Sequence, residues 1–213
     1  MAELGMRDLM LERFLDFLEE RHGQETVRCV LDELGDMTGT SVAPAHGGIG
    51  ERGQRLRAAA EFASMALASN RAETLRAFGG WLIDHHTFGW VADVRIDSDL
   101  TALGRRLAAV INGIIESSNA MRLADHATRS EKVTLVYRDE AGWADIVQGA
   151  IDTWLRVHAP EYRLARSDLS HVCGTHVQFC LHAPHEIRQP AHNTWPRHGG
   201  TVPRPDQTAG RQD

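Results

Sequence analysis

The sequence predicts an α+β fold, in which an N-terminal helical subdomain leads into a small antiparallel sheet with a packed helix. Two adjacent patterns support this prediction. Residues 100–118 carry apolar side chains at spacings of three and four, which is typical of an amphipathic helix. Residues 132–137 then alternate between apolar and polar side chains, as a half-buried strand does. The apolar stripe of the central helix consists of Leu100, Leu103, Leu107, Val110, Ile111 and Ile114.

Helical patterns fill the first half of the chain. Gly35 is expected to end the second helix as its C-cap, and residues 36–50 are rich in glycine and small side chains, which indicates a loop. Asn70 is expected to cap the fourth helix, where Glu73 complements the helix dipole. The four helices predicted before the central one are residues 8–21, 25–34, 52–69 and 71–83.

Strands and one further helix are predicted in the second half. Residues 143–157 form a helical stripe that Pro160 stops, and residues 162–169 and 176–181 are predicted as two strands joined by a turn. Because helices are followed by strands, the fold class is α+β. Residues 1–182 are therefore expected to form one domain. Residues 183–213 hold five of the seven prolines without apolar periodicity, which predicts a disordered tail that the fold does not need.

Composition narrows the functional classes. The net charge of −6 gives no general attraction to nucleic acid or to an anionic membrane. No stretch approaches the roughly 20 apolar residues of a membrane span. The N-terminal residues lack the apolar run of a secretory signal, and three cysteines are a sparse, odd set. We therefore expect a cytoplasmic protein with reduced thiols.

Four segments together resemble the heme nitric-oxide/oxygen binding (H-NOX) family, the sensor domain also found in soluble guanylate cyclases. They match its opening helix, its "LLRAFGRYL" helix, the strand that leads into its Tyr-x-Ser-x-Arg motif, and its "LVEGLI" helix. The likeness covers about residues 6 to 182. It implies a heme cofactor, a diatomic gas ligand and a signalling partner such as a kinase or cyclase. The matching segments are residues 14–25, 75–82, 133–138 and 146–151.

The residues that would hold heme depart from the family pattern. The position of the axial histidine falls at or beside Ile115, and no histidine occurs between residues 86 and 126. In the propionate-binding motif, Tyr137 is retained, but Asp139 stands in place of the serine and Ala141 in place of the arginine. Without imidazole and guanidinium, iron loses its axial bond and the propionates lose a bidentate partner. Heme is therefore possible by resemblance but doubtful by chemistry.

Two other groups of side chains have ligand chemistry. His85 and His86 follow the predicted fourth helix and could supply an alternative iron ligand, although histidines also favour a helix C-terminus. Cys173, His176, Cys180 and His182 could bind zinc, but a second ligand pair is absent from their pattern, so ordinary strand residues are the preferred interpretation. No metal site is predicted.

The first hypothesis is thus a non-enzymatic sensor or regulatory protein of the H-NOX type that has lost standard heme ligation. Its pocket, with Tyr137, Ile115, His85 and His86 as candidate residues, would hold another apolar ligand or a diatomic gas, or be filled by side chains. The alternative is a structural or assembly protein that uses the fold only as an interaction surface. No constellation of residues supports an enzyme.

Overall fold

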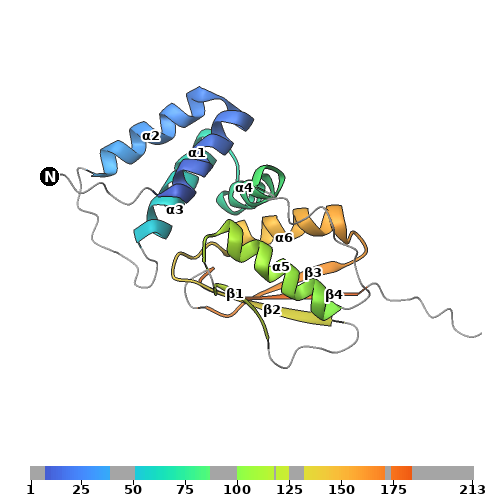
Figure 1. Cartoon of the computed structure of the whole chain (residues 1–213). Coiled ribbons are helices and arrows are strands. Elements are labelled where there is room, and N and C mark those ends of the chain that lie inside the picture. Colours follow the sequence, from blue (N-terminus) through green and yellow to red (C-terminus); the bar gives the residue numbers. More distant parts are fainter. Residues whose placement is uncertain are drawn as a thin grey trace, which may run out of the picture.

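The computed structural model describes residues 8–38, 51–86, 100–117, 119–124, 132–170 and 174–183. Within these ranges, Figure 1 shows two halves: α1, α2 and α3 on one side, α5 and α6 over a sheet on the other, and α4 between them. The elements are α1 (Leu9–His22), α2 (Gln24–Thr38), α3 (Glu51–Ala66), α4 (Arg71–His86), α5 (Leu100–Ile114), β1 (Met121–Leu123), β2 (Lys132–Arg138), α6 (Ala144–His158), β3 (Arg163–Asp168) and β4 (His176–His182). The predicted α+β class is confirmed.

The four described strands form one antiparallel sheet in the order β1-β2-β4-β3. In its register, Leu135 is opposite Phe179 and Val133 is opposite Leu181, and all four side chains are fully buried. Alternation thus gives the sheet one apolar face. Helices α5 and α6 both lie on that side of the sheet (Figure 1), so two helices cover the face where the sequence predicted one.

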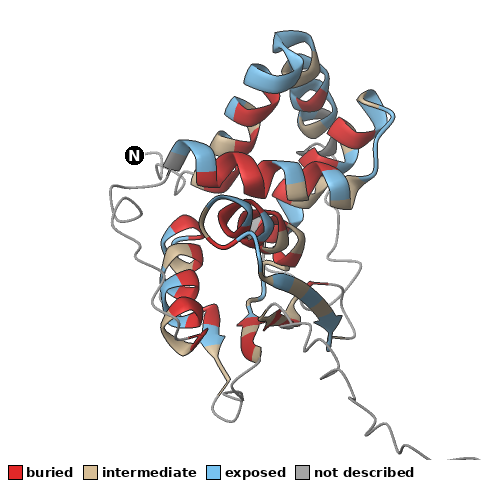
Figure 2. Ribbon diagram, turned by 90° about the vertical axis from the view of Figure 1, so that its right-hand side faces the viewer, coloured by how far each residue is buried: buried red, intermediate tan, exposed pale blue. Residues whose placement is uncertain are grey.

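A continuous apolar core joins the two halves. Figure 2 shows buried residues along the helix sides that meet in the middle of the molecule. In the upper part of the core, the ring of Phe78 on α4 lies edge-on to Phe14 of α1, with 5.2 Å between ring centroids. Phe17 and Trp81 extend this aromatic cluster, with centroids 6.1 Å apart. Such pairs add geometric specificity to the burial of apolar area.

Glycines bring α4 and α6 into direct backbone contact. A Cβ atom on Gly79 would lie 1.9 Å from the carbonyl oxygen of Ile146, and one on Gly149 would lie 1.9 Å from that of Arg76. Neither glycine can therefore carry a side chain while the helices keep this separation. This pair of helices fixes how the helical half is seated on the sheet half.

The central helix ends earlier than the sequence predicts. Residues 100–118 were expected to be helical, but α5 ends at Ile114, and Glu116 adopts a left-handed φ of 52°. The side chain of Asn112 accepts from the amide of Met121 at 2.8 Å and donates to its carbonyl at 2.9 Å. This polar clamp turns the chain back into β1. Because β1 has only three residues, its alternation of Met121, Arg122 and Leu123 is too short to indicate a strand, and β1 was not predicted.

Helix ends in the first half also differ from the prediction. Gly35 does not cap α2, because the helix continues through it to Thr38. A Cβ atom at this position would meet no other atom within 4 Å, so nothing there requires a glycine. Helix α4 runs to His86, so His85 and His86 lie within it. The Asn70 cap is confirmed: its side chain accepts from the amide of Ala72 at 2.8 Å. The loop was predicted over residues 36–50, but residues 36–38 belong to α2. Residues 39–50, the predicted connection 87–98 and all but the first residue of the predicted tail 183–213 lie outside the described residues.

Candidate ligand site between the helical half and the sheet

Tyr137 lies at the end of β2, on the covered face of the sheet, and is fully buried. Its hydroxyl oxygen accepts a hydrogen bond from the backbone amide of Trp143 at 3.0 Å. The pKa of the phenol is raised above its ordinary value, mainly because burial penalises the phenolate and also because of the charge of Asp139. Tyr137 is therefore a neutral core residue that ties β2 to the start of α6.

The turn after Tyr137 is stabilised by the side chain of Asp139 within the turn and by a backbone hydrogen bond to Thr175, just before β4. The amide of Ala141 donates to the Asp139 carboxylate at 2.7 Å, and the amide of Asp139 donates to the carbonyl of Thr175 at 3.0 Å. Helix α3 is seated directly on this turn, since a Cβ on Gly53 would lie 2.2 Å from the Ala141 carbonyl oxygen. The resemblance implies that a heme propionate is bound at this turn. Here the backbone of Gly53 contacts the turn at Ala141.

Ile115 follows the last residue of α5 and has only 4% of its surface exposed. Its amide still donates to the carbonyl of Ile111 at 3.0 Å, so its position is fixed relative to the helix. An isoleucine side chain has no lone pair for a metal. Tyr137 and Ile115 are thus both buried residues of the same apolar core.

His85, near the C-terminal end of α4, contacts a residue of α1. Its ring stacks on Trp81 with a centroid distance of 4.3 Å, and its Nε2 lies 3.1 Å from the Glu20 carboxylate. The indole of Trp81 donates to the same carboxylate at 2.9 Å. His85 is therefore part of an α1–α4 contact. His86 is placed only as the last residue of α4.

Two buried indoles lack hydrogen-bond partners among the described residues. The Nε1 atoms of Trp143 and Trp154 are both inaccessible to solvent. Trp143 donates its backbone amide to Tyr137 and is the N-cap residue of α6. A buried donor without an acceptor is unfavourable, so such a group is a candidate contact for a small bound molecule. No local sequence pattern signals that the Nε1 donors of Trp143 and Trp154 lack partners.

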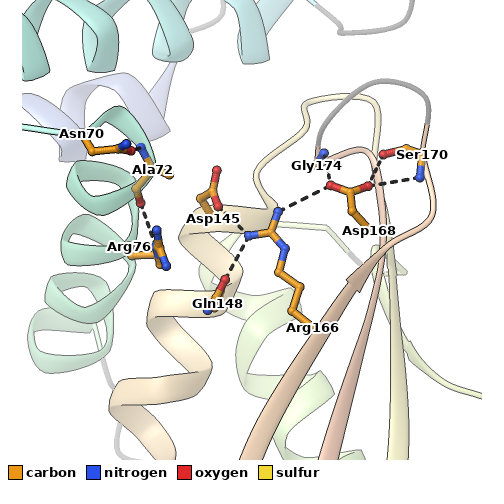
Figure 3. Close-up of polar contacts among 9 residues, drawn as sticks. All are labelled: Asn70, Ala72, Arg76, Asp145, Gln148, Arg166, Asp168, Ser170 and Gly174. Atoms are coloured by element: carbon orange, nitrogen blue, oxygen red, sulfur yellow. Dashed lines mark hydrogen bonds and ion pairs between the residues drawn. The ribbon is translucent and has the colours of Figure 1, made fainter.

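A polar cluster anchors α6 to the edge of the sheet (Figure 3). Arg166 of β3 pairs with Asp145 at 2.5 Å and donates to Gln148 at 2.9 Å. Asp168 accepts from the Ser170 hydroxyl and lies 3.6 Å from Arg166. Burial alone would raise the pKa of Asp168, but the hydrogen bonds from Ser170 and Gly174 and the Arg166 charge hold it below its ordinary value. This cluster supports the fold and offers no reactive arrangement.

A groove of about 490 Å³ runs between α1, α4 and α6. Arg76 and Arg156 face Asp152 there, and Arg21 and Asp84 also line it. Burial raises the pKa of Asp152, while the two arginines and Gln148 partly oppose the shift. The groove is thus lined by three arginines and two carboxylates, and among the described residues no ion pair joins them.

The cysteine and histidine candidates are arranged as the strand pattern predicts. His176, Cys180 and His182 stand on the face of β4 away from the helices, and Cys173 lies outside the described residues. Within the described part of the chain, no group of three or more metal-ligating side chains comes together. No helix of that part is long and apolar enough to cross a membrane.

The geometry defines a class of protein: an α+β domain in which α5 and α6 cover one face of a four-stranded antiparallel sheet, and α4 joins this half to the helical half. At the junction, α3 contacts the turn between β2 and α6, and Arg13 of α1 donates to the carbonyl of Ile114 at the end of α5 at 3.1 Å. Solved structures then identify the fold as H-NOX-like, as the sequence resemblance predicted.

Three solved structures illustrate the likeness. The unliganded Fe(II) H-NOX protein from K. algicida is 14% identical, with a TM-score of 0.58, over 83% of this chain and 96% of that one. A point mutant of the T. tengcongensis H-NOX is 15% identical, with a TM-score of 0.60, over 83% and 97%. The S. oneidensis H-NOX in its Fe(II)NO state is 13% identical, with a TM-score of 0.56, over 83% and 98%. At these identities, the likeness is one of fold.

Neither a protein-family model nor a curated protein sequence matches the chain.

Proposed function

We propose that this protein is a non-enzymatic sensor or regulatory protein that keeps the H-NOX-like fold but has lost standard heme ligation. The fold supports the sensor class, because its structural neighbours include Fe(II) and Fe(II)NO forms of H-NOX proteins. The loss of heme ligation is supported by the chemistry of Ile115 and Ala141, which offer iron no imidazole and a propionate no guanidinium.

The observation that carries the proposal is the contact between α3 and the turn after Tyr137. Gly53 and Ala141 touch through their backbones, and Ile115 and Tyr137 are buried in the apolar core. The carboxylate of Asp139 adjoins the same turn, and its charge opposes an anionic heme edge. The residues present therefore do not fit heme in the family's manner. A small, largely apolar ligand with one hydrogen-bond acceptor fits these residues better, because it would accept from the buried indole Nε1 of Trp143.

The second candidate is an assembly or interaction protein whose core is filled by side chains. The aromatic cluster favours it, because Phe14 and Phe78 are fully buried against each other and leave their rings no exposed surface. In this case the fold presents surfaces to a partner, and nothing is bound inside.

Heme content and native mass spectrometry of the isolated protein test both candidates. The K. algicida H-NOX protein, expressed in the same heme-replete cells, serves as the positive control for a pyridine hemochrome assay. We expect far less than one heme per chain here. One heme per chain would overturn the proposal. An additional bound mass without heme would support the ligand-binding sensor, whereas the mass of the bare chain would favour the interaction protein.

A further inference from the structure

The face of the sheet away from the helices carries a distinctive set of charges. Cross-strand partners point to the same side of a sheet, so the register assigns each strand residue to a face. Arg166, which contacts α6, and Val133, which contacts Gly104 of α5, mark the covered face. The residues that alternate with them form what we call the open face. Its basic and imidazole side chains are Arg122, Lys132, Arg138, Arg163, His176 and His182.

The described strand residues of the open face include no carboxylate, although the protein carries a net charge of −6. Asp168 is the only acidic residue in the four described strands, and its register opposite Val177 places it on the covered face. Arg122, Arg138 and Arg163 are exposed. Among the described residues, no ion pair joins any of the six side chains to a carboxylate.

The cations lie at the rim of the open face. Lys132, His182 and Arg163 form one row across three strands, and Arg138 with His176 forms another, about 20 Å away at ~3.4 Å per residue. Between the rows, Arg122 lies opposite Val136 on the edge strand β1, and the side chains of the two inner strands are uncharged. There, the buried Thr134 and the half-buried Gln178 both approach the sulfur of Cys180, at 3.6 and 3.8 Å. A charged rim around an uncharged centre is the usual anatomy of a protein–protein interface.

We propose that the open face is a docking surface for a partner protein that presents an acidic surface. Charge complementarity selects such a partner and speeds its encounter. Nucleic acid fits less well, because the two aromatic residues of the described strands, Tyr137 and Phe179, are on the covered face and leave no platform for base stacking. The proposal goes beyond the sensor function and does not depend on what the core binds, since the sheet separates this face from the core.

An acidic peptide tests the docking surface directly. A fluorescein-labelled oligoglutamate peptide is titrated with the full-length protein at low ionic strength, and binding is followed by anisotropy. The triple variant Arg122→Glu, Arg138→Glu, Arg163→Glu reverses the rim. The matched control Arg55→Glu, Arg105→Glu, Arg106→Glu reverses three exposed helix arginines. Each variant replaces three positive by three negative charges, so both change the net charge from −6 to −12.

We expect wild type and control to bind with similar affinity, and the rim variant to bind at least about tenfold more weakly, a change of about 1.4 kcal/mol. The wild-type affinity should also fall as salt is raised, a measurement that needs no variant. Circular dichroism checks that both variants are folded. An equal loss in the control, or no binding by wild type, would overturn the proposal.

Two further outcomes would assign the open face to a binding partner other than an acidic protein, and either would overturn the proposal. A single-stranded oligonucleotide of equal charge that binds the wild type more tightly than the peptide would assign the face to nucleic acid and overturn the proposal. Self-association of the wild type in sedimentation, lost in the rim variant, would identify a second copy instead. A second copy is a real competitor, because α1 and α2 each carry four carboxylates against two arginines and one arginine, respectively.

Discussion

Ile111 and Ile114 show how single residues hold the central helix on the rest of the core. Both are buried, at 0% and 4% exposure. We expect Ile111→Ala and Ile114→Ala each to lower the free energy of unfolding by about 2–5 kcal/mol, because the removed side chain leaves a cavity. Chemical denaturation measures this, with the exposed Arg105→Ala as a control that should change it by less than about 0.5 kcal/mol. Costs near zero for both isoleucines would contradict the packing of α5.

Asp168 should make stability depend on pH in the acid range. Its pKa is held below the ordinary value of 3.8, so its ionised form stabilises the fold fully above that pH. The contribution is lost as the pH falls through the lower pKa of the folded state. We therefore expect Asp168→Asn to lower the Tm near neutral pH and the difference from wild type to shrink below about pH 4.

Scanning calorimetry across this pH range measures the difference. Ser170→Ala should reproduce part of the effect, since the Ser170 hydroxyl donates to Asp168 at 2.6 Å. A Tm difference between wild type and Asp168→Asn that is constant from neutral to strongly acid pH would show that the carboxylate charge is not what stabilises the loop.

At the scale of elements, the close packing of α4 and α6 is the contact most sensitive to added volume. Gly149→Ala would place a methyl group 1.9 Å from the Arg76 carbonyl oxygen. We expect it to destabilise the protein by about 1–3 kcal/mol, because the helices must separate. Gly35→Ala is the matched control: it lies in α2 with open space around it, and should stabilise by about 0.5–1 kcal/mol. Equal stabilities for the two variants in denaturant would contradict the contact.

Elements with long periodic patterns were predictable from the sequence. The stripe through α5 and the alternation in β2 and β4 reflect burial on one face, which is a local property of the chain. The three-residue strand β1 was not predictable, because Asn112 holds Met121 through contacts that follow only from the tertiary fold. The continuation of α2 past Gly35 shows that an isolated glycine is a weak stop signal.

At the scale of the whole molecule, the sequence predicted that Tyr137 shares the apolar face of its strand but not how the residues around it are arranged. Tyr137 was identified through the resemblance, and its burial followed from strand alternation. The backbone contact of Gly53 with Ala141 joins residues far apart in the chain, and no local pattern encodes it. His85, predicted as an alternative iron ligand, lies within α4, which ends three residues beyond its predicted end, and its ring pairs with Glu20 of α1.

The central claim is that the protein does not bind heme through the central helix. Hemin is added to the purified protein and the Soret band recorded for wild type, for the double variant His85→Ala, His86→Ala, and for single replacements across residues 112–117. We predict no stoichiometric band in wild type, because Ile115 cannot coordinate iron and Ala141 cannot hold a propionate. A band lost only in the double variant would move the ligand to α4. A strong band that persists in the double variant but vanishes with a replacement between Asn112 and Ser117 would contradict the claim.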